Sequence, residues 1–114
     1  MRKMIVLPQS PEELFERLFA ILPEYQAARR PIHDDAPTFH SVLREFSTFF
    51  GGPACSMSKR QLRSFGELVS AAMEAGGRLE NAFATCLLEH AEQIGVWKPL
   101  RPFLSRTAIE KSNA

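Results

Sequence analysis

Apolar positions along this chain recur every three or four residues, which is the period of a helix with one buried face. Four of these stretches are long enough to be main helices, and they cover about 11–22, 37–50, 59–75 and 78–94. Proline and glycine gather between the stretches, as at Gly51-Gly52-Pro53 and Gly76-Gly77, where they favour helix ends. The pattern therefore predicts an all-α protein.

The starts of two predicted helices carry recognisable capping residues. Ser10 can accept a hydrogen bond from the first turn of its helix, and Ser58 with Gln61 three residues later forms a capping box. Beyond residue 94 the signals are shorter, and they predict short C-terminal helices near 99–104 and 105–111.

The helix predicted at 37–50 has the densest apolar stripe, formed by Phe39, Val42, Leu43, Phe46, Phe49 and Phe50. Each buried aromatic side chain removes a large apolar area from water, so this helix is expected to be the central packing element. Four amphipathic helices must hide their stripes against one another, which predicts a single irregular bundle over residues 1–114. The same stripe leaves the oligomeric state open, with a homodimer among the options.

Composition agrees with this fold and excludes several classes of protein. Alanine and leucine outnumber isoleucine and valine by 25 to 9, a balance typical of helices. The 14 Lys and Arg nearly cancel the 13 Asp and Glu, so a protein that mainly coats nucleic acid is not expected. No apolar run approaches the roughly 18 residues of a membrane span. Two cysteines are too few for a secreted disulfide scaffold, and a cytoplasmic protein is expected.

Cys86 and His90 are the strongest candidates for metal chemistry. They lie four residues apart on one predicted helix face and could share a zinc ion if Cys55, His33 or His40 completed the ligand set. Both positions also fall within the apolar stripe, where a buried cysteine and a core histidine are common. We favour this second interpretation and expect neither a metal nor another cofactor.

A catalytic set is not visible in the sequence. Asp34-Asp35 is better explained by its place before a helix, and Glu89 with Glu92 is typical of a solvated helix face. The glycine pairs lack the spacing of phosphate-binding loops. The sequence therefore predicts a protein that is not an enzyme.

Lys59, Arg60 and Arg63 crowd the predicted start of the helix at 59–75, where positive charge opposes the helix dipole. That arrangement is consistent with a surface that meets a partner, and equally with long side chains that cost little in water. A recognition helix of a helix-turn-helix protein would present its first turns in this way, so a small DNA-binding or regulatory protein is the alternative. The connection before residue 58 is longer than the turn of that motif.

The segment 65–89 combines Phe65-Gly66-Glu67-Leu68, a glycine turn and a helix in which Asn81-Ala82 leads through Thr85 to Leu88-Glu89. It resembles a family of small uncharacterised bacterial all-helical domains with an F-x-x-[LI] helix, a glycine turn and an N-A-x-x-[TS]-x-x-L-E helix. Those domains are similar to immunity proteins, which neutralise a toxin by binding it. The resemblance implies a helical, non-catalytic protein.

The resemblance also implies that Asn81 and Glu89 contact a partner. For Asn81 we instead favour a hydrogen bond to the backbone of the Gly76-Gly77 turn. The expected function is a protein–protein interaction module, most concretely immunity to a bacterial toxin. Its candidate contacts are Asn81, then Glu89 and Glu92 for a basic partner, or Lys59, Arg60 and Arg63 for an acidic one.

Overall fold

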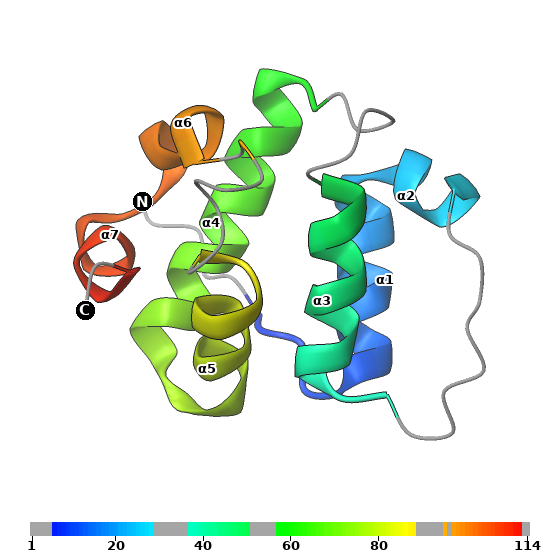
Figure 1. The fold of residues 1–114 in the computed structure, drawn as a ribbon, viewed down its shortest axis with the longest axis horizontal. Helices are drawn as coiled ribbons and strands as arrows, with labels where there is room; N and C mark the ends of the chain where they lie inside the picture. Colours follow the sequence, from blue (N-terminus) through cyan, green and yellow to red (C-terminus); the bar gives the residue numbers. More distant parts are fainter. Residues whose placement is uncertain (1–5, 29–36, 51–56, 89–94, 96, 113–114) are drawn as a thin grey trace.

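The computed structural model describes residues 6–28, 37–50, 57–88, 95 and 97–112, and within these ranges the secondary structure is entirely helical (Figure 1). The elements are α1 (Pro11–Ile21), α2 (Pro23–Ala28), α3 (Phe39–Phe50), α4 (Lys59–Ala75), α5 (Gly77–Cys86), α6 (Trp97–Leu100), the 3-10 helix η2 (Arg101–Phe103) and α7 (Arg106–Ser112). The predicted all-α class is confirmed.

The capping residues act as expected. Ser10 Oγ accepts from the backbone N–H of Glu13 at 3.2 Å at the start of α1. At the start of α4, Ser58 Oγ accepts from the N–H of Gln61 at 3.1 Å, and Gln61 Oε1 accepts from the N–H of Ser58 at 2.9 Å. The capping box is thus complete, and both helices begin where the sequence places them.

The predicted helix at 37–50 begins two residues later, at Phe39. Thr38 acts as its cap, because Thr38 Oγ1 accepts from the N–H of Ser41 at 3.0 Å and Ser41 Oγ accepts from the N–H of Thr38 at 2.8 Å. This reciprocal pair satisfies the first turn of α3, so the helix has no need of an earlier start.

The predicted helix at 78–94 is wrong in length, because α5 ends at Cys86. Leu87 leaves the helical conformation, with φ −124° and ψ −64°. Ser47 of α3 donates its hydroxyl to the Cys86 carbonyl at 2.7 Å and so satisfies an acceptor that a longer helix would have used. Leu87 and Leu88 then turn into the core, where both are buried. Among the described residues, α5 therefore has 10 residues instead of the 17 expected, beside α1, α3 and α4 with 11, 12 and 17.

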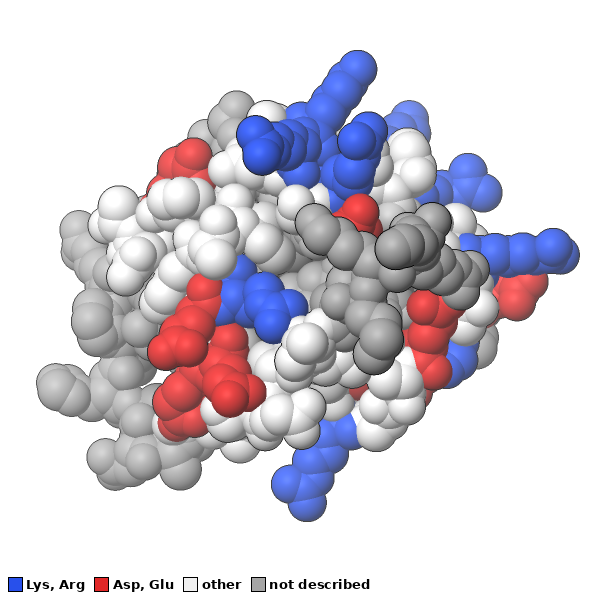
Figure 2. Space-filling model, turned by 180° about the vertical axis from the view of Figure 1, so that it is seen from behind, with Lys and Arg blue, Asp and Glu red and all other residues white. Residues whose placement is uncertain are grey.

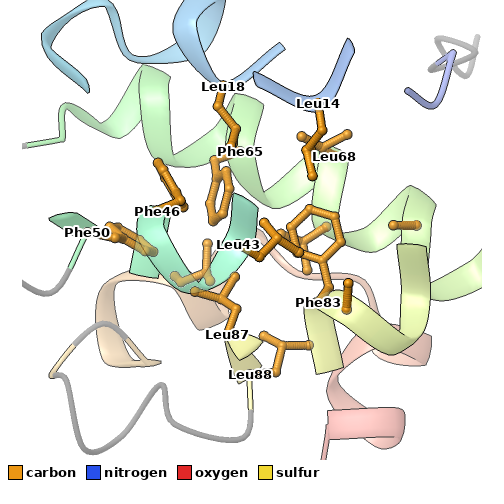
Figure 3. Close-up of a cluster of buried hydrophobic side chains, with 14 of the residues drawn as sticks. Leu14, Leu18, Leu43, Phe46, Phe50, Phe65, Leu68, Phe83, Leu87 and Leu88 are labelled. Atoms are coloured by element: carbon orange, nitrogen blue, oxygen red, sulfur yellow. The ribbon is translucent and has the colours of Figure 1, made fainter. Parts of the chain in front are cut away.

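The core forms where α3, α4 and α5 meet, with α1 covering α3 and α4. Phe65 of α4 is fully buried, and its ring centroid lies 5.1 Å from that of Phe46, 5.3 Å from that of Phe50 and 6.3 Å from that of Phe83. Figure 3 shows these rings among the leucines of α1, α3, α4 and the segment after α5. The phenylalanine-rich helix therefore supplies much of the core, as the sequence predicts.

A glycine turn joins α4 to α5. Gly76 and Gly77 have φ values of 77° and 86°, which residues other than glycine rarely adopt. The reversal lays α5 against α4, and α5 also packs along α3. One short helix thereby bridges the two longer ones.

The short C-terminal helices expected after residue 94 are present, and they pack along α4 and, through Lys111, against α5. The N–H of Ser105 donates to Ser70 Oγ at 2.8 Å, and Lys111 forms an ion pair with Glu80 at 3.0 Å. Gly66 lies so close to η2 that an added Cβ would sit 2.6 Å from the Cβ of Phe103. Among the helices that the structure describes, none is both long and apolar enough to cross a membrane.

Candidate functional site

Charged side chains are unevenly distributed over the surface. We define the basic face as the exposed cations on the first turns of α4 and on the adjacent α6 and η2: Lys59, Arg60, Arg63, Lys98 and Arg101. The exposed glutamates at the start of α1 form a separate acidic cluster: Glu12, Glu13 and Glu16. Figure 2 shows Lys and Arg side chains together over the beginning of α4, while acidic side chains gather over α1. A net charge of only +1 therefore conceals two surfaces of opposite sign.

The basic face consists of side chains directed to solvent. Within the described part of the chain, no hydrogen bond or ion pair involves the side chains of Lys59, Arg60 or Arg63. The nearby Glu24 carboxylate bonds to Gln61 instead, and the charge of the three cations opposes the dipole of α4. Such charge acts at a distance on whatever approaches this end of the helix.

Gln61 lies between these cations, and both ends of its side-chain amide form hydrogen bonds within the protein. Besides its part in the capping box, its Nε2 donates to the carbonyl of Ile21 and to Glu24 Oε2, each at 3.3 Å. These bonds tie the start of α4 to the end of α1 and the start of α2. They also occupy an amide that could otherwise pair with adenine in the DNA-binding alternative.

The packing of α3 and α4 also differs from that of a helix-turn-helix. Each of the two helices makes its extensive backbone contacts with α5, and they meet one another through the rings of Phe46, Phe50 and Phe65. The geometry supports a rigid base for the basic face rather than a recognition helix held by a preceding helix.

A second group of polar side chains lies between α3 and α5. His40, on the first turn of α3, has its Nδ1 3.4 Å from Cys86 Sγ and 3.3 Å from Thr85 Oγ1. Its Nε2 lies 3.4 Å from Nδ2 of Asn81. We refer to His40, Asn81, Thr85 and Cys86 as the α3–α5 cluster. His40 and Cys86 are half-buried, whereas Asn81 and Thr85 are exposed.

Hydrogen bonding defines two consistent states of this cluster. The Thr85 hydroxyl donates to the Asn81 carbonyl at 2.8 Å, so its oxygen can accept from Nδ1–H of His40 while Nε2 accepts from the Asn81 amide. Rotating that amide by half a turn presents Oδ1 to Nε2 and moves the proton to Nε2, since amide orientation is assigned from its bonding. Nδ1 is then an acceptor facing the Cys86 thiol. This second tautomer exchanges the bond between His40 and Thr85 for one between His40 and the Cys86 thiol, because Thr85 Oγ1 has already donated its proton to the Asn81 carbonyl.

A cleft with a volume of about 580 Å³ opens beside the cluster. It lies where the starts of α1, α3 and α5 come together and is lined by Gln9, Ser10, Pro11, Pro37, Thr38, Phe39, His40, Arg78 and Asn81. Arg78 is the charged residue of this lining. The cleft gives small molecules access to one edge of the His40 imidazole and to the Asn81 amide.

The site residues expected from the sequence have partners in the structure that differ from those expected, or lie outside the described residues. Asn81 is exposed, but its amide meets His40 on the neighbouring helix, and the expected bond to the Gly76-Gly77 turn is replaced by this contact. Cys86 also contacts His40, 46 positions away, while His90 lies outside the described residues. Glu89 and Glu92 lie outside them too. In the described ranges, no group of three or more His, Cys, Asp or Glu side chains could hold a metal ion.

Scans against protein-family models, curated proteins and solved structures each gave no match for this chain. The residues and their geometry are therefore the basis for a functional proposal.

Proposed function

We propose that this protein is a non-catalytic interaction module whose basic face docks onto an acidic surface of a partner protein. The observation that carries the proposal is the separation of charge between the start of α4 and the start of α1. Neutralisation of a bacterial toxin by occlusion is its most concrete form, as the resemblance of segment 65–89 implies.

The fold supports this role because the basic face rests on an ordered base. The capping box fixes the first turn of α4, and Gln61 bonds to the end of α1 and to Glu24. A partner meeting this face loses little conformational entropy beyond that of the long cationic side chains. Charges of this kind chiefly raise the association rate, and salt screens their effect.

A duplex DNA partner is the alternative, and two observations weigh against it. Gln61 is occupied by internal bonds, and α3 and α4 lack helix-turn-helix packing. The basic face also has only five cations, and the net charge of the whole chain is only +1, whereas proteins that bind DNA tightly neutralise many phosphates.

The test uses the product of the gene adjacent to this one as the candidate toxin. We would measure its association rate with the wild-type protein by surface plasmon resonance at low and high salt, and its toxicity when the two are co-expressed. The triple variant Lys59→Glu/Arg60→Glu/Arg63→Glu should lower the association rate by roughly tenfold or more at low salt. Glu12→Lys/Glu16→Lys is the matched control and should not lower it.

Absence of both binding and protection with the neighbouring product would refute toxin neutralisation. Equal losses in the triple variant and in the control would refute the basic face as the docking surface. Salt-dependent retention of the wild-type protein on a DNA duplex, lost in the triple variant, would favour the DNA-binding alternative instead.

A further inference from the structure

In the α3–α5 cluster a thiol, an imidazole and an amide lie side by side in space, with the imidazole in the middle. Cys86 Sγ lies 3.4 Å from Nδ1 of His40, and the other ring nitrogen lies 3.4 Å from the side-chain amide of Asn81. A nucleophile beside a base, with a third group that orients the base, is the arrangement that activates side-chain nucleophiles. We infer that Cys86 is a modification site at which the thiol, with His40 as its base, reacts with small hydroperoxides.

The hydrogen bonds allow the proton transfer that this chemistry needs. With Asn81 Oδ1 turned toward Nε2, His40 carries its proton on Nε2 and can accept the thiol proton at Nδ1. The resulting imidazolium donates to the Cys86 sulfur on one side and to the Asn81 oxygen on the other. Asn81 is thus a positioning residue, since it holds the ring in place without contacting the sulfur.

Charged groups of both signs lie on the two helices that carry the pair. Arg44 lies one turn beyond His40 on α3, and Arg78 lies on α5 at the wall of the cleft that reaches His40. Of the acidic groups on these two helices, Glu80 is paired with Lys111 at 3.0 Å, and Glu45 follows Arg44 on α3. Ser47 donates its hydroxyl to the Cys86 carbonyl at the C-terminal end of α5, beside the thiol.

The reaction consumes one hydroperoxide for each thiol. The thiolate sulfur attacks the terminal oxygen, an S–O bond forms and the O–O bond breaks. Sulfur loses two electrons to become a sulfenic acid, and the peroxide is reduced to an alcohol, or to water when the oxidant is hydrogen peroxide. The leaving oxygen takes its proton from the imidazolium, which restores neutral His40.

The experiment uses the full chain with Cys55→Ser, so that Cys86 is its one thiol. The rate of sulfenic acid formation with hydrogen peroxide is followed by dimedone trapping and mass spectrometry, and alkylation by iodoacetamide is measured in parallel. We expect the folded protein to react about tenfold faster or more at neutral pH than the same protein unfolded in urea, in line with general-base assistance. His40→Gln should remove this advantage, and Asn81→Ala should reduce it in part.

Thr48→Ala, on the same helix as His40 but with its hydroxyl bonded to the Arg44 carbonyl, is the matched control and should leave the rate unchanged. Circular dichroism establishes which variants are folded. A folded wild-type protein that reacts more slowly than the unfolded chain would overturn the inference, whatever the variants do. A folded His40→Gln variant that keeps the full rate would overturn it too.

Discussion

Replacing Gly66 with alanine sets helix propensity against packing. Gly66 lies within α4, where an alanine in a helix interior is favoured over glycine by about 1 kcal/mol. The position is buried, and a Cβ there would lie 2.6 Å from both the Cβ and the carbonyl oxygen of Phe103. Restoring an ordinary contact of 3.4 Å requires α4 and η2 to separate by about 0.8 Å.

That separation is costly because one of the opposing atoms belongs to the backbone and cannot rotate away. Next to η2, Leu100 and Leu104 are buried and would lose contacts with the core as η2 moved. Overpacking of this kind typically costs about 1–3 kcal/mol, with larger values when backbone must shift. Because backbone atoms are opposed here, we take the upper part of that range, about 2–3 kcal/mol. After subtraction of the gain of about 1 kcal/mol in helix propensity, Gly66→Ala should lower the free energy of unfolding by about 1–2 kcal/mol.

Urea unfolding followed by circular dichroism measures this change directly, and thermal unfolding should show a midpoint lower by roughly 4 °C per kcal/mol for a chain of 114 residues. Ser64→Ala, at an exposed position two residues earlier on α4, is the control and should be neutral or slightly stabilising. If Gly66→Ala instead stabilises the protein by about the propensity difference, α4 and η2 do not approach as closely as a Cβ-to-Cβ distance of 2.6 Å requires.

Three further substitutions test other parts of the fold by the same urea assay. Ser58→Ala removes the capping box with Gln61 and should lower the free energy of unfolding by about 1 kcal/mol. An unchanged midpoint would show that the box does not stabilise the protein. Ser70→Ala leaves the N–H of Ser105 without its acceptor and should cost about 1–3 kcal/mol, whereas a neutral result would imply that water replaces the hydroxyl. Phe65→Ala opens the fully buried centre of the ring cluster and should cost about 3–5 kcal/mol, and a loss below 1 kcal/mol would contradict its central place.

The elements that the sequence predicts well are those specified by neighbouring residues. The capping box of Ser58 and Gln61 uses residues three positions apart, and the Gly76-Gly77 turn is set by the backbone freedom of the glycines themselves. The end of α5 was not predictable in this way. At that end the hydroxyl of Ser47, 39 positions earlier in the chain, donates a hydrogen bond to the Cys86 carbonyl.

In the candidate site too, features set by neighbouring residues are predictable and those set by packing between distant helices are not. Exposed charge at Lys59, Arg60 and Arg63 follows from helical periodicity alone. The contact of Cys86 with His40 depends on how α3 packs along α5, while local spacing pointed to His90. Gly66 carried a usable signal, because a glycine inside an otherwise strong helix often marks a close approach of another segment.

The separation of charge between α4 and α1 gives the molecule an electric dipole moment. An approaching charged body exerts a torque on it, so the protein rotates before the two surfaces touch. At physiological ionic strength this torque acts within about 8 Å of the surface, the Debye length, and it extends further in dilute buffer. Reversing the sign of the charges at the start of α4 alone, or of α1 alone, would weaken or invert the preferred orientation of the protein while leaving the number of charged groups unchanged.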